Sequence, residues 1–411
     1  MYALRGRLRH GAFLFLTAKR SARSCFRSAS LGHISYLCSM FNVNTKHRIN
    51  IGPAQKMEQI ENNSIELVVT SPPYPMIEMW DEIMVKQNPY IKTSLNKYDG
   101  TEAFELMHAE LDKVWKEVER VLIPGGFACI NIGDATRTIN GDFVLYPNHS
   151  RIIAAFQKLG VHNLPNILWR KQTNAPNKFM GSGMLPSGAY VTLEHEWILI
   201  FRKGRKRQFM SDSEKIKRKE SSFFWEERNV WFSDLWDLKG TKQKIAYFET
   251  RKRSAAYPFE IPYRLINMYS LQGDTVLDPF LGTGTTTLAA IAANRNSVGF
   301  EIDPMFFNII SDNIESTPVN YFNSVVQNRI DQHISFINKR KTDIKKSEIK
   351  HYNEYLKLPV ITNQETDIKF WFVTGLERKG NEIIVMYDSC MPVHAEVPKS
   401  NKKAERTLFN L

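Results

Sequence analysis

Two alternating patterns of hydrophobic positions run along the middle of the chain. Short, β-branched apolar runs are typical of buried parallel strands, and they predict strands at residues 64–70, 127–132, 166–170, 196–202, 275–277 and 297–300. Apolar residues at three- and four-residue spacing predict helices at residues 101–122, 150–159, 262–271 and 286–294. This alternation of strands with helices indicates an α/β protein with a mostly parallel sheet.

Two segments depart from this alternation. Residues 201–255 show no clean period, so we interpret them as an insertion. Residues from about 321 to the end are rich in Lys, Asn and Ile and contain strand-like runs at 370–373 and 382–387. They predict a small accessory region without a recognisable motif. A length of 411 residues is consistent with two to three domains.

Positive charge is concentrated in two places. The chain has 55 Lys and Arg against 43 Asp and Glu, which gives a net charge of +12. Residues 1–39 contain seven basic residues and no acid, and residues 201–255 contain sixteen basic residues against eight acids. The second block is also rich in Trp and Phe, and such a basic block indicates a polyanion as its partner.

The leader at residues 1–39 has two interpretations. Its Arg and Ser enrichment without acids is typical of a transit peptide to a mitochondrion or another organelle. Met40 is a second candidate start, and in that case the protein is expected in the cytoplasm. The apolar stretch at 11–17 is well short of the ~20 residues of a membrane span, so no membrane partner is expected. The four cysteines have no C-x-x-C spacing, which fits a reducing compartment.

A glycine-bearing loop joins the strand at 275–277 to the helix at 286–294. Its sequence is Asp-Pro-Phe-Leu-Gly-Thr-Gly-Thr, residues 278–285, and its glycines let a ligand approach the backbone closely. The full dinucleotide fingerprint is absent because Thr287 occupies the third glycine position. The next strand ends at Glu301, where a carboxylate can hold the two ribose hydroxyls of an adenosine-containing cofactor.

A second loop, Ser71-Pro72-Pro73-Tyr74, follows the strand at 64–70. An exocyclic amino group of a base is a poor nucleophile, because its lone pair is delocalised into the ring. A catalyst must therefore accept its N–H hydrogens so that the nitrogen becomes pyramidal and aims the lone pair at a methyl donor. The hydroxyl of Ser71 and the carbonyl of Pro72 are suitable acceptors, and the prolines fix them rigidly. Tyr74 offers a ring on which a flipped base can stack.

At these two loops the chain resembles the amino-methylating DNA methyltransferases that use S-adenosylmethionine, with a catalytic motif of the cytosine-N4 type. The family's catalytic motif is S/D-P-P-Y and its cofactor motif is D-P-F-x-G-x-G. Here the catalytic motif comes first, which is the permuted order of the family's beta class. The resemblance covers residues 49–310 and implies a doubly wound, mostly parallel sheet with a reversed terminal strand.

The resemblance also assigns roles to residues and segments. The implied site residues are Ser71, Pro72, Pro73 and Tyr74 for catalysis, and Asp278, Phe280, Gly282, Thr283, Gly284, Thr285 and Glu301 for the cofactor. It implies a catalytic half (40–200), a basic target-recognition insertion (201–255) and a cofactor-binding half (256–320), between the leader (1–39) and the accessory region (321–411) that composition indicates. One departure is Gly52-Pro53 where the family has Gly-Asp, so Gln55 becomes the candidate contact to the adenine.

Duplex DNA is the expected partner, together with a cognate restriction endonuclease; monomer and homodimer both stay open. The runs at 75–81 and 174–183 resemble the subset of cytosine-N4 enzymes that act on CTAG. Basic triplets in the insertion are the candidate phosphate contacts, namely Arg205, Lys206, Arg207, Lys217, Arg218, Lys219, Arg251, Lys252 and Arg253.

The same residues leave two alternatives open and exclude other function classes. Adenine-N6 methylation is the alternative, since Ser71 in place of Asp favours cytosine without requiring it. A DNA-binding protein that uses the same scaffold without catalysis is the alternative from another class. Carbon-5 cytosine methylation needs a Pro-Cys nucleophile, and no cysteine here follows a proline. No metal is expected, because the zinc-deaminase signature requires P-C-x-x-C together with H-x-E, and the chain contains no P-C-x-x-C.

Overall fold

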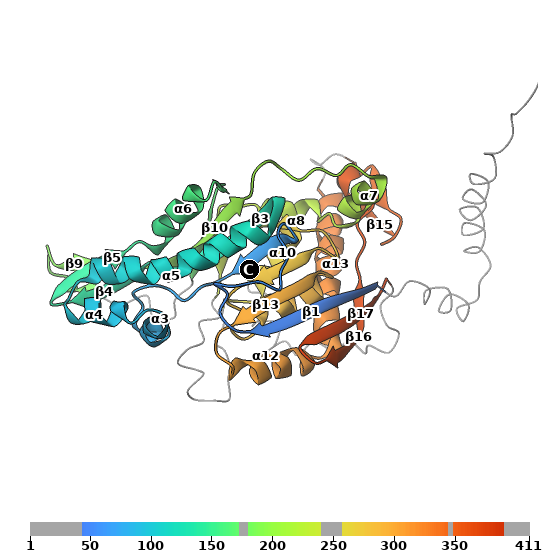
Figure 1. Cartoon of the computed structure of the whole chain (residues 1–411). Coiled ribbons are helices and arrows are strands. Elements are labelled where there is room, and N and C mark those ends of the chain that lie inside the picture. Colours follow the sequence, from blue (N-terminus) through green and yellow to red (C-terminus); the bar gives the residue numbers. More distant parts are fainter. Residues whose placement is uncertain (1–42, 172–179, 240–256, 344–347, 390–411) are drawn as a thin grey trace, which may run out of the picture.

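A large sheet runs through the molecule in the computed structural model, which describes residues 43–171, 180–239, 257–343 and 348–389 (Figure 1). The strand order is β11-β7-β10-β3-β2-β12-β13-β1-β17-β16, and β6 pairs with β10. The strands are β1 (Val43–Ile51), β2 (Ile65–Thr70), β3 (Leu122–Ile132), β6 (His162–Asn163), β7 (Ile167–Lys171), β10 (His195–Arg202), β11 (Leu235–Leu238), β12 (Thr275–Asp278), β13 (Asn296–Glu301), β16 (Phe372–Lys379) and β17 (Glu382–Asp388). The leader at 1–39 lies outside the described residues.

Helices cover both faces of this sheet. They are η1 (Glu78–Trp80), α3 (Asp81–Gln87), α4 (Tyr90–Asn96), α5 (Gly100–Val121), α6 (Asn148–Lys158), α7 (Asp212–Glu220), α8 (Trp225–Trp231), α10 (Glu260–Tyr269), α11 (Thr285–Ala292), α12 (Phe306–Glu315), α13 (Val319–Lys341) and η2 (Asn363–Glu365). Three small hairpins complete the fold: β4 (Ala135–Ile139) with β5 (Asp142–Tyr146), β8 (Met180–Gly181) with β9 (Ala189–Tyr190), and β14 (His351–Asn353) with β15 (Leu358–Val360). No helix in the described ranges is long and apolar enough to cross a membrane.

The predicted strands and helices between residues 64 and 310 are confirmed, with one boundary moved by five residues. The strand expected at 127–132 begins at Leu122, directly after α5 ends at Val121. Leu122 already pairs with Ile65 of β2, and a register shift follows before Phe127 pairs with Leu67. The Pro-Gly-Gly stretch therefore lies in the early part of the strand, where a bulge absorbs it.

The sheet is parallel at its centre and has antiparallel pairs on both sides of it, although the edge strand β11 is again parallel to its neighbour β7. The neighbours from β3 through β2, β12 and β13 to β1 are all parallel. Two strands are reversed: β10 runs antiparallel to both β3 and β7, and β17 runs antiparallel to both β1 and β16. Each lies between two strands of the opposite direction, whereas the resemblance implied a single reversed terminal strand.

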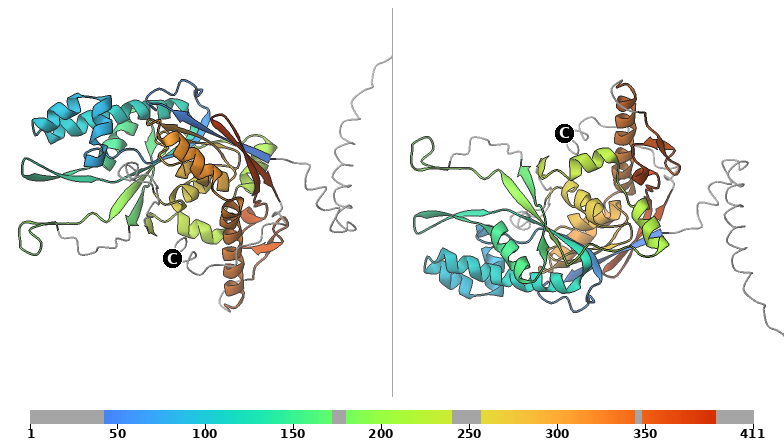
Figure 2. Two further views of the ribbon diagram at one scale, coloured as in Figure 1. Left: turned by 90° about the horizontal axis from the view of Figure 1, so that it is seen from below. Right: turned by 90° about the horizontal axis from the view of Figure 1, so that it is seen from above.

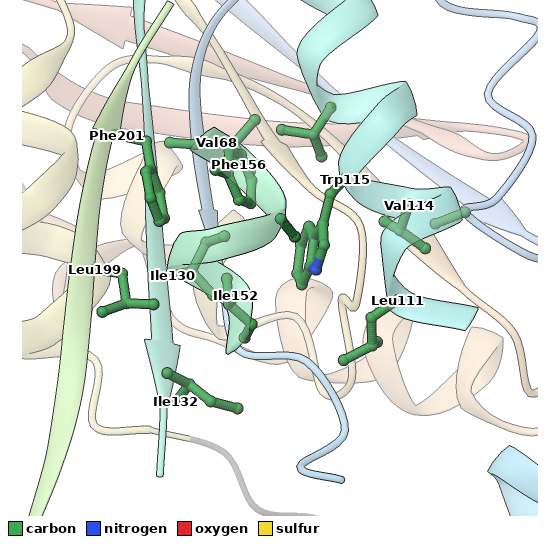
Figure 3. Packing of buried hydrophobic residues seen from close by; sticks show 14 of the residues in the cluster. Val68, Leu111, Val114, Trp115, Ile130, Ile132, Ile152, Phe156, Leu199 and Phe201 are labelled. Carbon is green, nitrogen blue, oxygen red and sulfur yellow. The ribbon is translucent and has the colours of Figure 1, made fainter. Parts of the chain in front are cut away.

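Alternate residues of the central strands form two separate cores. Val68, Ile130 and Leu199 face one side and pack with Trp115 of α5 and Phe156 of α6 (Figure 3). The intervening residues of the same strands face the other side, against α10, α11, α12 and α13. This is the alternation expected of parallel strands that are buried on both faces.

The chain changes its winding direction between β2 and β12. From β2 it crosses through α5 to β3 on one side, and from β12 it crosses through α11 to β13 on the other. Such a switch point leaves a crevice at the carboxyl ends of the two strands, because the loops that follow them turn away from each other. Both predicted functional loops begin there.

The two segments without a clear period are integrated into this fold. Residues 201–239, for which no regular elements were predicted, contain α7, α8 and β11, and β11 extends the central sheet next to β7. In the accessory region, β17 pairs with β1 and β16 pairs with β17, so the strand-like runs predicted there extend the same sheet.

The two hairpins β4–β5 and β8–β9 project away from the body on the same side as α3 and α4 (Figure 2). Phe143 of one hairpin stacks on Tyr190 of the other, with ring centroids 4.5 Å apart. The turn that joins β8 to β9 carries exposed Met184 and Leu185. This side of the molecule therefore has an extended surface beyond the ends of the central strands.

Candidate active site

The two predicted loops meet at the carboxyl ends of β2 and β12. Thr70, the last residue of β2, donates a hydrogen bond from its Oγ1 to Oδ1 of Asp278 at 2.6 Å, and both side chains are buried. Ser71 follows immediately. One pocket is lined by all of the predicted catalytic and cofactor residues except Gly284: Ser71, Pro72, Pro73, Tyr74, Asp278, Phe280, Gly282, Thr283, Thr285 and Glu301.

Asp278 holds the cofactor loop in shape. Its carboxylate accepts hydrogen bonds from Thr70, from the backbone N–H of Phe280 at 3.0 Å and from Oγ1 of Thr286 at 2.5 Å. Burial raises the pKa of Asp278 to about 6, although these hydrogen bonds favour its charged form. Gly284 has φ +85° at the start of α11, a conformation that favours glycine. A Cβ at Gly284 would come within 3.1 Å of Cγ2 of Ile310 on α12, so this glycine packs against α12 and is not part of the pocket wall.

Glu301 lies across the pocket from the catalytic loop, at the carboxyl end of β13. Its Oε2 accepts the N–H of Gly282 at 2.9 Å, and its Oε1 accepts the N–H of Asp303 at 3.0 Å. Burial raises the pKa of Glu301 to about 7. Each carboxylate oxygen keeps a further lone pair, so two adjacent hydroxyl donors can bind to it. These acceptors fit the two ribose hydroxyls of an adenosine-containing cofactor.

A third wall of the pocket was not predicted from the sequence. It consists of Trp80 of η1 together with Ile83 and Gln87 of α3. The side-chain amide of Gln87 accepts a hydrogen bond from that of Gln55, so Gln55, the candidate adenine contact, does lie in the pocket. The seven-residue α3 is too short to give a periodic signal, which is why the sequence did not reveal this wall.

A buried polar cluster supports the catalytic loop from below. The hydroxyl of Tyr74 lies 2.9 Å from Oε2 of Glu196, 2.7 Å from Nδ2 of Asn131 and 3.1 Å from Oγ of Ser71. Lys171 makes an ion pair with the other oxygen of Glu196. Burial and the nearby carboxylate raise the pKa of Tyr74 well above its usual value, so its proton stays on the oxygen.

The comparison with known families identifies the class of enzyme. Residues 65–312, more than half of the chain, match the family of N6 and N4 DNA methylases. The chain belongs to this family. Its members use S-adenosylmethionine, and the pocket of this methylase has carboxylate acceptors that suit the hydroxyls of the cofactor's ribose.

Similar proteins support the assignment across nearly the whole methylase. The type II methyltransferase M.MthZI of Methanothermobacter thermautotrophicus is 50% identical over 360 residues, which are 87% of this chain and 99% of the relative. M.MjaI of Methanocaldococcus jannaschii, also a type II methyltransferase, is 50% identical over 72% of this chain and 98% of its own. A DNA modification methylase of Thermus thermophilus, solved with S-adenosylmethionine, is 31% identical, with a TM-score of 0.51 over 65% of this chain and 94% of that protein.

The described basic triplets of the methylase do not lie at this pocket. Arg207 and Lys217 pair with Asp274 at the amino end of β12, at 2.6 and 3.4 Å. Lys219 pairs with Asp367 of the C-terminal region at 3.2 Å. Arg205 and Lys206 adjoin Arg207 and are exposed, and Arg218 covers the ring of Phe209. The third triplet, Arg251, Lys252 and Arg253, lies outside the described residues.

Proposed function

We propose that this methylase transfers the methyl group of S-adenosylmethionine to the exocyclic N4 of a cytosine that is flipped out of double-stranded DNA. The observation that carries the proposal is Ser71, a hydroxyl at the head of the Ser-Pro-Pro-Tyr loop in the pocket that also contains the cofactor loop. A serine at this position is the cytosine-N4 form of the motif, whereas an aspartate favours adenine. Adenine-N6 is the alternative target.

The residues of the loop would activate the amino group in three ways. Ser71 Oγ and the carbonyl of Pro72 accept the two N–H hydrogens, which makes the nitrogen pyramidal and frees its lone pair. Pro72 and Pro73 fix the acceptors before the base arrives, so little reorganisation is needed in the transition state. The ring of Tyr74, which lines the pocket, supports the flipped base. S-Adenosylmethionine supplies an electrophilic methyl group on a sulfonium.

The duplex would approach the side from which the hairpins β4–β5 and β8–β9 project. β4–β5 extends beyond the carboxyl end of β3, and β8–β9 extends beyond the amino end of the antiparallel strand β10, which lies at the same edge of the sheet as the catalytic loop. Arg251, Lys252 and Arg253 precede Tyr257, a pocket residue, by six residues or fewer. Because this triplet is close in sequence to a pocket residue, we assign the phosphate contacts to it.

The sequence CTAG is the proposed target, and the enzyme is the modification half of a type II restriction–modification system. The first part rests on the resemblance of residues 75–81 and 174–183 to CTAG-specific enzymes. In the structure, residues 75–81 lead from the catalytic loop into η1, and Trp80 lines the pocket. The second part rests on the two relatives of 50% identity, both of which are type II methyltransferases.

Nucleoside mass spectrometry tests the proposal directly. Residues 40–411 are incubated with labelled S-adenosylmethionine and a duplex that contains CTAG, and the DNA is then digested to nucleosides. N4-Methylcytosine that disappears when CTAG is scrambled to CATG is the expected result. N6-Methyladenine would overturn the base assignment, and label in scrambled DNA would overturn the target sequence. Cofactor binding without any modified nucleoside would favour a DNA-binding protein without catalysis.

A further inference from the structure

The polar cluster beneath the catalytic loop contains a carboxylate with no role in the reaction described above. Glu196 lies on β10, is 8% exposed, and faces the hydroxyl of Tyr74. Its Oε1 pairs with Lys171, and its Oε2 accepts from both Tyr74 and Asn131. A carboxylate paired with an ammonium ion is ionised, so Glu196 can only accept hydrogen bonds.

The orientation of the Asn131 amide follows from this charge. Its Nδ2 lies 2.7 Å from Oε2 of Glu196 and 2.7 Å from the hydroxyl oxygen of Tyr74, and 3.4 Å from Oγ of Ser71. A flipped amide would place its oxygen against the carboxylate, with no hydrogen between the two atoms. The nitrogen must therefore face Glu196. The two hydrogens of this nitrogen serve the two short contacts, to Glu196 and Tyr74.

The hydrogen bonds of Tyr74 now have only one arrangement. A phenol has one hydrogen, and Glu196 takes it, because a carboxylate cannot donate. The phenolic oxygen accepts one hydrogen from Asn131. Its contact with Ser71 at 3.1 Å is then a hydrogen bond only if Ser71 donates. The hydroxyl hydrogen of Ser71 is thus directed at Tyr74, and the lone pairs of its oxygen remain for the pocket.

We infer that Glu196 is a positioning residue that fixes the hydrogen-bond direction of the chain Ser71 to Tyr74 to Glu196, so that Ser71 can only accept hydrogen bonds from the substrate amino group. This inference rests on the proposed role of Ser71. An unconstrained serine hydroxyl can also donate, and a donor aimed at the amino nitrogen would occupy the lone pair that attacks the methyl group. The buried carboxylate removes that arrangement before the base enters.

Two substitutions at the same residue separate the acceptor from the charge. Glu196→Leu removes the acceptor, and the single-turnover methylation rate should fall about 100-fold. Glu196→Gln removes the charge but keeps an acceptor oxygen, which the hydrogens of Asn131 and Tyr74 hold in place, and its rate should stay within about fivefold of the wild type. Equal losses in the two variants would overturn the inference, because the charge alone would then matter.

Tyr74→Phe removes the middle hydroxyl of the hydrogen-bond chain from Ser71 through Tyr74 to Glu196. Once the phenol is absent, Glu196 cannot act on Ser71, so the double variant with Glu196→Leu should be about as slow as the slower single variant. Multiplied losses would show that Glu196 acts by another route. If Glu196→Leu fails to fold, the methylation rates of the two conservative variants test the inference. A much reduced rate for Tyr74→Phe with a nearly normal rate for Glu196→Gln supports it. A nearly normal rate for Tyr74→Phe with a much reduced rate for Glu196→Gln overturns it.

Binding measurements and a matched control complete the experiment. The affinities for S-adenosylmethionine and for the duplex should change less than about threefold in all variants, whereas a collapsed loop would weaken both. Glu194→Gln is the control. Glu194 directly precedes the same strand, its side chain is 41% exposed, and Arg170 lies 3.9 Å from its carboxylate. The modified nucleoside of the wild type is identified first. N6-Methyladenine would revise the target base alone, and the rate comparison would still test Glu196.

Discussion

The two ends of the same parallel strands differ in what their charged groups do. At the amino end of β12, Asp274 is 2% exposed, and its carboxylate is occupied by Arg207, Lys217 and the N–H of Leu271. At the carboxyl end, Glu301 accepts two backbone N–H groups and keeps lone pairs for a ligand. One end uses its charges to hold the fold together, and the other keeps acceptors available for cofactor and base.

The largest effect is expected from Ser71→Ala at the carboxyl end. Removal of one preorganised acceptor should lower the single-turnover rate about 1000-fold, while the affinity for S-adenosylmethionine changes little. Quenched single-turnover reactions at saturating cofactor measure the rate, and calorimetry measures the affinity for S-adenosylmethionine. Ser324→Ala, an exposed site on α13, is the control and should match the wild type. Comparable losses in rate and cofactor affinity would contradict the role assigned to Ser71.

How far the sequence could predict this site depends on how local each signal is. Ser71 and Glu301 were found because a motif or a strand end marks them within a few neighbouring residues. Glu196 and Asn131 were missed, since they meet Tyr74 from two other strands, 122 and 57 residues away. The available signal was weak: Glu196 lies two residues before the buried Ile198 on β10, so its side chain is on the same face of the strand.

The fold shows the same division between local and distant information. Strand and helix patterns predicted the strands that carry the two loops and the longer helices beside them, because each period is a property of one segment, but they missed the short η1 and α3. The neighbours of β11, β16 and β17 could not be predicted, since strand pairing depends on contacts between distant segments. Charge density likewise showed that residues 201–255 are basic, but it could not show that Arg207 and Lys217 pair with Asp274 at the end opposite the pocket.

The second prediction compares two basic clusters. Replacement of Arg251, Lys252 and Arg253 by Ala should weaken duplex binding about 30-fold at low salt and reduce the slope of log affinity against log salt by about 2 to 3. The double variant Arg205→Ala with Lys206→Ala, near the amino end of β12, should leave the duplex affinity and its salt slope nearly unchanged. Fluorescence anisotropy over a salt series measures them. An equal reduction of affinity and salt slope in both variants would show that Arg205 and Lys206 also contact the DNA.

Glu301 gives a smaller effect that depends on pH. Its raised pKa of about 7 means that the empty pocket binds a proton below that pH, whereas ribose hydroxyls donate best to the ionised carboxylate. Affinity for S-adenosylmethionine should therefore be complete above about pH 8 and fall as the pH drops through 7. Glu301→Gln should bind about tenfold more weakly and lose this pH dependence. Calorimetry from pH 5.5 to 8.5 tests this, and a flat wild-type profile would contradict the ribose assignment.

The smallest effect on the reaction is expected from Asp274→Asn, which tests the other side of the comparison. The amide cannot balance Arg207 and Lys217, so the free energy of unfolding should fall by about 2 kcal/mol. The rate at 25 °C should stay within about twofold of the wild type, because the folded fraction remains high and the pocket lies at the far end of β12. Urea unfolding measures the first quantity, and single-turnover assays measure the second. Asp212→Asn, whose side chain is 94% exposed, is the matched control. A large loss of rate in the folded Asp274→Asn protein would show that the two ends of the sheet are coupled and that the separation between them fails.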